Sequence, residues 1–295
     1  MSTAAIGAAD QGTGERRSFL SGLDGKAALA LPGILFMVLA FALPLALLVA
    51  ESFRGAEGIT LAGYRKVLGD PYYLGIIWNS VKLALITTTI CLVLGYPAAF
   101  ALARASGTTQ VVLFALIFLP LTVSIIVKTF GISIMMGRGG FINWLLVALG
   151  FIDRPMRLVF TEFNLYFGMV NVFLPFMILP LYSIMRMLDG RLTDAAASLG
   201  ASPLYAFTRV TLPLTMPGVI AGVSLVFSIS VAAYVTPGLL IGDRFMTMSQ
   251  VMAKAYLNIR DFQLGASMAV IMLVIAVSVV FGASWLGRGH AVRGR

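Results

Sequence analysis

Six long stretches of this chain contain no charged side chain, and each is long enough to cross a lipid bilayer. A transmembrane helix needs about 20 successive apolar residues. Because lipid offers no hydrogen-bond partner to a free backbone group, each spanning stretch is expected to be helical. The six uncharged runs are 27–50, 83–103, 105–127, 163–185, 210–242 and 262–287. The sequence therefore predicts an all-α protein, a polytopic membrane helical bundle with six transmembrane helices.

Two apolar runs have lengths that need interpretation. The run 210–242 exceeds one span, so we place its membrane helix at 217–241 and assign 210–216 to the preceding loop. A seventh uncharged run, 139–152, is too short to cross a bilayer, and we interpret it as an interfacial or re-entrant helix.

The composition agrees with a membrane protein and not with a soluble domain. Hydrophobic residues make up 59% of the chain and charged residues 11%, and the mean hydropathy is +0.96, which lies far outside the soluble range. We expect one transmembrane domain over 26–288, a disordered cytoplasmic tail over 1–25 and a basic cytoplasmic tail over 289–295. The net charge of +9 is expected to reflect basic loops beside anionic lipid rather than binding to nucleic acid.

Residues that could support catalysis or hold a metal ion are scarce. His290 is the only histidine, so the chain has no histidine-based metal cluster and no Ser-His-Asp set. The phosphate loop that ends in Gly-Lys-Ser/Thr is also missing. Cys91, the only cysteine, lies within the second run and is expected to pack there. We therefore expect no catalytic residue, no metal site and no cofactor in this chain.

The loop between the fourth and fifth runs carries the clearest local pattern. Asp194 opens the segment Asp-Ala-Ala-Ala-Ser-Leu-Gly, where its carboxylate suits the positive end of a short alanine-rich helix. Gly200 stands where that helix must end, a position that often needs a left-handed backbone. Ser202 and Pro203 are typical of an N-cap and a first helical residue. The pattern therefore predicts a short helix-turn-helix between two membrane spans.

This loop resembles the cytoplasmic "EAA" loop of ABC-importer permeases. That consensus is Glu-Ala-Ala, three residues, Gly, nine residues, then Ile-x-Leu-Pro; here Asp194 replaces the Glu and Val210 replaces the Ile, with all spacings kept. A DNA-binding helix-turn-helix is the alternative, but Arg209 would be the only basic residue on its second helix, and DNA recognition needs several basic contacts. No nucleic-acid partner is expected.

Further segments resemble the spermidine/putrescine branch of these permeases, over about 33–270. They are 79–80, 95–99, 118–120, 140–143, 174–182 and 234–237. The resemblance implies a multi-pass permease subunit of the bacterial inner membrane, with both termini in the cytoplasm. It also implies three kinds of partner: ABC ATPase subunits, which bind ATP-Mg, a second homologous permease and a periplasmic substrate-binding protein. Lys and Arg are divided almost evenly between the two sets of loops, so the orientation rests on the resemblance alone.

The resemblance implies that the loop is a coupling helix that docks on the ATPase, with small residues for close approach and apolar residues as anchors. The loop residues carried over are Asp194, Ala195, Ala196, Leu199, Gly200, Tyr205, Phe207, Leu212 and Pro213. Candidate residues for the translocation path are polar or aromatic groups near the outer ends of the spans. They are Lys128, Glu162, Tyr166, Tyr234 and Thr236. We read Lys82, at the start of the second run, as a side chain that reaches out to the lipid headgroups.

A polyamine such as spermidine or putrescine is the implied substrate. Glu162 could attract such a cation, whereas the charge of Lys128 fits an anionic group better. Another small organic solute, such as an opine or an aminophosphonate, therefore stays open. A secondary transporter that works without ATP is the other alternative, but no acidic residue lies in the middle of any expected span.

Overall fold

The structure is a computed structural model that describes residues 25–55, 58–189 and 191–291. The expected tail over 1–25 lies outside the described residues except for Gly25, and so do residues 292–295 of the basic tail. The chain divides into two compact units, one ending at Leu48 and the other beginning at Val49. The second unit holds most of the helices and every site considered below.

The described chain is almost entirely helical. Its only strands are two residues each and pair antiparallel, Arg54 with Ile59 and Gly55 with Gly58. In order, the elements are α1 (Gly25–Ser52), β1 (Arg54–Gly55), β2 (Gly58–Ile59), α2 (Ala62–Gly69), α3 (Pro71–Arg104), α4 (Gly107–Phe118), η1 (Leu119–Thr122), α5 (Ile125–Met135), α6 (Phe141–Ala148), α7 (Glu162–Met187), α8 (Arg191–Ser198), α9 (Pro203–Ala206), η2 (Phe207–Thr211), α10 (Leu212–Ala232), α11 (Val235–Leu240), η3 (Gly242–Arg244), α12 (Met248–Lys254), η4 (Ala255–Ile259) and α13 (Phe262–Ala291).

Among the described residues, five helices are long and apolar enough to cross a membrane. They are the stretches Leu31–Ser52, Pro71–Arg104, Glu162–Met187, Pro203–Ala232 and Phe262–Trp285. A sixth span is formed if α4 with η1 and α5 are taken as one broken span. The all-α prediction is thereby confirmed. The helix in the short run, α6, has eight residues, which is too few to cross a bilayer.

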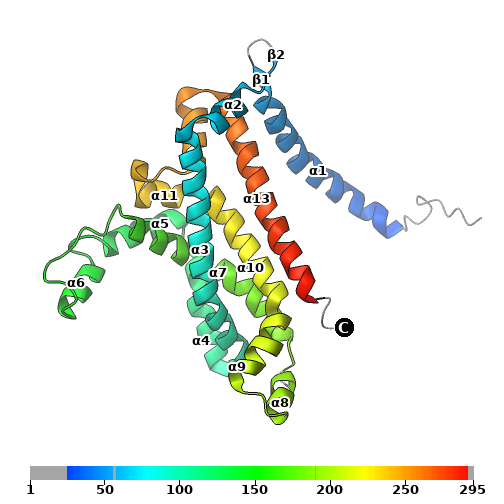
Figure 1. The fold of residues 1–295 in the computed structure, drawn as a ribbon, viewed down its shortest axis with the longest axis vertical. Helices are drawn as coiled ribbons and strands as arrows, with labels where there is room; N and C mark the ends of the chain where they lie inside the picture. Colours follow the sequence, from blue (N-terminus) through cyan, green and yellow to red (C-terminus); the bar gives the residue numbers. More distant parts are fainter. Residues whose placement is uncertain (1–24, 56–57, 190, 292–295) are drawn as a thin grey trace, which may run out of the picture. The chain divides into compact units, whose positions relative to one another are not determined.

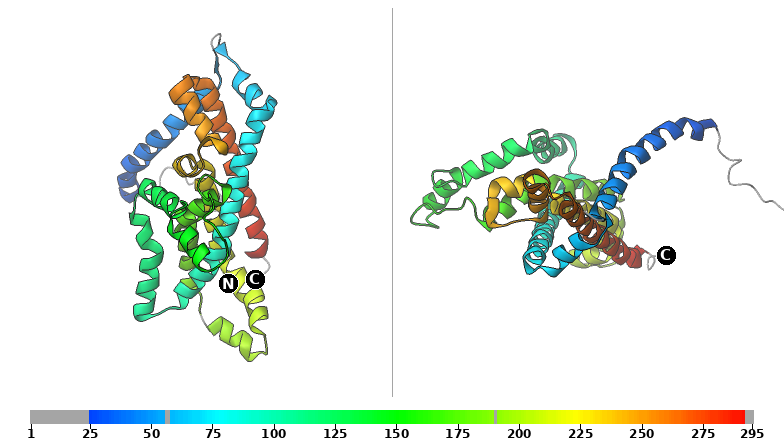
Figure 2. Two further views of the ribbon diagram at one scale, coloured as in Figure 1. Left: turned by 90° about the vertical axis from the view of Figure 1, so that its left-hand side faces the viewer. Right: turned by 90° about the horizontal axis from the view of Figure 1, so that it is seen from above.

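The third expected span, 105–127, is not one straight helix. It breaks after η1, and α5 is bent by 103° from the helix before the break; Figure 2 shows the two segments pointing in different directions. Pro120 lies at the break and Val123 is extended, with φ −85° and ψ 134°. Since proline has no N–H and crowds the preceding turn, a straight helix through this position is unfavourable.

The fifth expected span, 217–241, was also misplaced. The helix runs without a gap from Pro203 to Ala232, so the residues 210–216 that we assigned to a loop are helical. Ala233 is extended, and α11 then starts a new helix. In a continuous helix Pro237 would remove an internal hydrogen bond, whereas in α11 it falls in the first turn, where its missing N–H costs nothing.

Helices α3, α7 and α10 pack against one another and hold the main core of the second unit (Figure 1). Met177 of α7 fits between glycines of its two neighbours. A Cβ built on Gly95 of α3 would lie 2.9 Å from Met177 Cγ, and one on Gly222 of α10 would lie 2.7 Å from Met177 Sδ. Small residues allow this close approach, as is common where helices pack in membranes. The three helices therefore form one closely packed unit.

Candidate functional site

The turn between α8 and α9 has the backbone that its sequence predicts. Gly200 has φ +84°, in the left-handed region. Its N–H donates to Ala197 O at 2.9 Å, and the N–H of Ala201 donates to Ala196 O at 3.0 Å. These two bonds form a Schellman motif, which satisfies carbonyls that the end of a helix leaves free. The predicted helix end at Gly200 is confirmed.

The start of α9 is also as predicted. Ser202 is the N-cap, and its side chain accepts a hydrogen bond from the N–H of Tyr205 at 3.3 Å. Pro203 is the first helical residue. On the other side of the turn, α8 begins at Arg191, whose N–H donates to Asp189 Oδ1 at 3.0 Å. Asp194 is thus the fourth residue of α8, and its side chain lies outside the described part of the structure.

The α8–α9 turn presents large apolar side chains to its surroundings. Leu199 is 89% exposed, Leu204 74% and Tyr205 58%. Ala195 and Gly200 are exposed beside them, and Ala196 is half-buried. We call Leu199, Leu204 and Tyr205 the apolar tip. Leu204 was not among the predicted site residues, because the sequence of such a short helix does not indicate which of its side chains face outward.

Phe207, predicted as an anchor for a partner, points into the protein instead. Its ring packs edge-on against the ring of Tyr96 in α3, with centroids 5.7 Å apart. The Tyr96 hydroxyl lies 2.8 Å from Thr215 Oγ1 in α10. Phe207 opens η2, one turn of π-helix between α9 and α10. We call Phe207, Tyr96 and Thr215 the joint, since they connect the loop to α3 and α10.

Leu212 and Pro213, the remaining predicted loop residues, lie in the first turn of α10. Leu212 is half-buried and Pro213 exposed. Pro213 comes just after the π-turn η2, so its missing N–H falls where the regular helical hydrogen bonds are already interrupted. These two residues belong to the helix that continues from the loop and not to the apolar tip.

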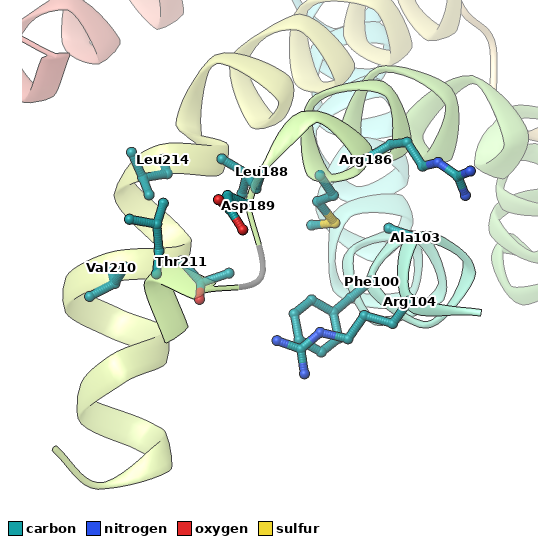
Figure 3. A pocket seen from close by; sticks show the side chains of 11 residues that line it. Phe100, Ala103, Arg104, Arg186, Leu188, Asp189, Val210, Thr211 and Leu214 are labelled. Atoms are coloured by element: carbon teal, nitrogen blue, oxygen red, sulfur yellow. The ribbon is translucent and has the colours of Figure 1, made fainter. Parts of the chain in front are cut away.

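A small cavity of about 230 Å³ lies at the base of the loop. Figure 3 shows Arg104 alongside Phe100 on one wall and Asp189 near Thr211 on the other, with Arg186 directed away. The guanidinium of Arg104 lies 4.1 Å from the centre of the Phe100 ring. The C-terminal ends of α3 and α7 are therefore not fully packed against η2 and α10, which leaves space at the base of the loop.

Glu162 and Tyr166, predicted for a translocation path, lie together at the start of α7. The Glu162 carboxylate is not free, because its Oε2 lies 3.3 Å from Lys82 Nζ in α3. The ammonium of Lys82 is also 5.9 Å from the centre of the Phe245 ring. The Tyr166 hydroxyl, one helical turn after Glu162, is buried and has no hydrogen-bond partner among the described residues. Lys82, interpreted from sequence as reaching out to headgroups, is instead paired with Glu162 in a partly exposed ion pair.

The other three path candidates are not part of this cluster. Lys128 of α5 is half-buried and has no ion pair within the described part of the chain. Thr236 is 3% exposed in α11, which packs against α5 and α7. Tyr234 lines a separate apolar groove between α10, α12 and α13. Lys128, Thr236 and Tyr234 therefore lie in surroundings that differ from one another.

No group of three or more His, Cys, Asp or Glu side chains in the described residues could hold a metal ion. Cys91 is buried, and its thiol lies 3.9 Å from Val170 O of α7. This place in the core agrees with a packing role.

Comparison with known proteins gives consistent results. The family described as "Binding-protein-dependent transport system inner membrane component" matches residues 93–290. The spermidine/putrescine transport system permease protein PotB of Escherichia coli K12 is 35% identical over 247 residues, which cover 81% of this chain and 90% of PotB. PotB of Haemophilus influenzae is 34% identical over 255 residues, which cover 84% and 88%.

More distant relatives carry other names. The molybdenum transport system permease protein ModB of Mycobacterium bovis is 31% identical over 204 residues, covering 69% of this chain and 75% of ModB. A crystal structure of a bacterial ABC transporter involved in alginate import has a TM-score of 0.71 at 15% identity, covering 89% of this chain and 94% of that one. This structural similarity shows that the two chains share a fold.

The matched region runs from α3 to α13 and includes the α8–α9 turn. The PotB relatives extend over most of both chains. The chain therefore belongs to the family of binding-protein-dependent transport system inner membrane components, and it is a multi-pass permease subunit of an ABC transporter rather than an enzyme.

Proposed function

We propose that this chain is the permease of an ATP-driven importer for polyamines, spermidine or putrescine. The observation that carries the importer mechanism is the exposed apolar tip on the α8–α9 turn. Three large apolar side chains on a tightly capped turn form the type of surface that anchors a partner protein. The partner we propose is a cytoplasmic ATPase subunit, with a second homologous permease and a periplasmic binding protein completing the importer.

The joint supplies a route by which movement of the loop reaches the membrane spans. Because α9, η2 and α10 follow one another as one helical stretch, displacing the loop displaces α10. The contacts of Tyr96 with Phe207 and Thr215 connect the same displacement to α3. The π-turn and the adjoining cavity give the base of the loop room to move, and such π-turns are frequent at functional sites.

The orientation follows from this docking role. If the α8–α9 turn meets an ATPase, it lies in the cytoplasm, and an even number of spans places both termini there as well. Within this orientation α3 and α7 run from the outer side inward, so the Lys82–Glu162 pair at the start of α7 lies in the outer half of the bundle.

Polyamine as the substrate is supported by the PotB relatives, each of which is named as a spermidine/putrescine permease. The Glu162 carboxylate and nearby aromatic rings suit an ammonium group. An opine, an aminophosphonate or another small organic solute is the second candidate, because the half-buried ammonium of Lys128 suits an anionic group better than a polyamine.

Uptake in reconstituted vesicles tests the proposal. The chain is combined with the second permease and the ATPase encoded beside it, and the matching binding protein and radiolabelled spermidine are added outside. We expect uptake that requires ATP inside the vesicles and the binding protein outside. The control contains this chain alone and should show no uptake. Uptake by the chain alone, driven by an ion gradient, would refute the importer mechanism.

A further inference from the structure

The cluster at the start of α7 places a carboxylate and an aromatic ring around one ammonium group. Lys82 Nζ lies 3.3 Å from a Glu162 carboxylate oxygen and 5.9 Å from the centre of the Phe245 ring. The hydroxyl of Tyr166, one helical turn after Glu162, is buried and has no hydrogen-bond partner among the described residues, so it is available to a further donor. A carboxylate, an aromatic face and a phenol oxygen are the groups that recognise alkylammonium ions in proteins.

We infer that Lys82 occupies a binding site for a substrate ammonium and that the substrate displaces it during transport. The side chain of lysine is a primary ammonium on a four-carbon stem. It therefore has the same chemistry as the end of a polyamine, and it fills the site when no substrate is present. This inference rests on the proposed function, since it names the part of the path that receives the polyamine.

Charge balance explains why an exchangeable lysine suits a transport path. The Glu162 carboxylate is partly shielded from water, so it attracts a cation whether or not substrate is present. Exchange of Lys82 for a substrate ammonium keeps the site neutral in both states. The Lys82 and Glu162 side chains are 36% and 53% exposed, so water can reach both and the pair is weak enough to open.

The experiment uses butylammonium as a probe of the site in the complete importer carrying Lys82→Ala. In this variant the site has lost its own ammonium and is open to an added one. We expect butylammonium to inhibit spermidine-stimulated ATP hydrolysis with an inhibition constant about tenfold lower in Lys82→Ala than in the wild type. Butanol, which has the same stem without the charge, should have no such effect. The double variant Lys82→Ala/Glu162→Gln should lose the added sensitivity.

A matched ion pair elsewhere provides the control. Lys254 Nζ lies 2.8 Å from Asp243 Oδ1, with the two side chains 40% and 78% exposed, and no described aromatic ring faces its ammonium. Lys254→Ala should leave the sensitivity to butylammonium unchanged. If Lys82→Ala does not assemble, Lys82→Gln carries the same test, because it keeps most of the length without the charge.

A second readout separates this inference from the proposed substrate. Butylammonium should raise the melting temperature of the solubilised Lys82→Ala importer more than that of the wild type, whatever solute the importer carries. Equal sensitivity of Lys82→Ala and wild type in both assays would overturn the inference, and so would sensitivity that survives in the double variant. Failure of spermidine to be transported, with the melting shift present, would refute the polyamine substrate but not the ammonium site.

Discussion

Replacement of Gly200 by glutamate is expected to leave the protein in the membrane while it disconnects ATP hydrolysis from transport. Gly200 has φ +84°, and a Cβ built there meets nothing within 4 Å. A side chain therefore clashes with nothing in this chain, and its internal cost is limited to the backbone. That cost is roughly 1–2 kcal/mol for a left-handed residue, which is a factor of about 5–30 in the population of the native turn. No membrane span is altered.

The graded pair Gly200→Ala and Gly200→Glu separates backbone strain from bulk. Alanine adds the strain and one methyl group, so we expect ATPase binding to weaken by at most about 5–30-fold. Glutamate adds a long charged side chain next to the apolar tip, so we expect ATPase binding to be lost. The measurements are the amount of protein in the membrane, co-purification of the ATPase, and hydrolysis stimulated by the loaded binding protein.

Gly150 offers a matched control at the end of α6. It has φ +74°, and a Cβ there would also meet nothing within 4 Å. The same two hydrogen bonds close its turn, from Gly150 N to Val147 O and from Phe151 N to Leu146 O, each at 3.0 Å. Gly150→Glu therefore adds equal strain away from the proposed docking surface and should transport normally. Normal coupled transport by Gly200→Glu, or equal loss in Gly150→Glu, would refute the docking role of the loop.

Three shorter predictions test other parts of the structure. With the native cysteine removed, a cysteine at Ser202 should react only with reagents on the cytoplasmic side and one at Asp70 only from the periplasm; periplasmic labelling at Ser202 would reverse the topology. Tyr96→Phe removes the 2.8 Å hydrogen bond to Thr215 and should cost about 1 kcal/mol of stability, seen as a lower melting temperature and weaker stimulated hydrolysis; unchanged values would argue against the joint. Gly222→Val places a Cβ 2.7 Å from a methionine sulfur and 3.2 Å from a backbone oxygen, so it should destabilise the bundle by about 1–3 kcal/mol, and a wild-type melting temperature would contradict that close packing.

Features that depend on a few neighbouring residues could be predicted from the sequence. The end of α8 at Gly200 and the start of α9 at Ser202 were correct, because helix caps are made by hydrogen bonds within three to five residues. The all-α membrane class followed in the same way, since lipid requires every span to satisfy its own backbone. The family resemblance was carried by this same local pattern and was confirmed by comparison.

The tertiary structure decided which face of each helix contacts a segment that is distant in the sequence. The sequence indicated Phe207 as an anchor, but its direction toward Tyr96 depends on how η2 packs on α3. The pairing of Lys82 with Glu162 joins residues that are 80 positions apart. The sequence contains several prolines within apolar runs. Which of these runs would break, before α5 and after Ala232 at the end of α10, depended on tertiary packing. The sequence by itself determined the membrane class and the capped loop, because those arise from local hydrogen bonds. The tertiary structure alone decided the joint and the pairing of Lys82 with Glu162, because each requires helices far apart in the chain to be placed side by side.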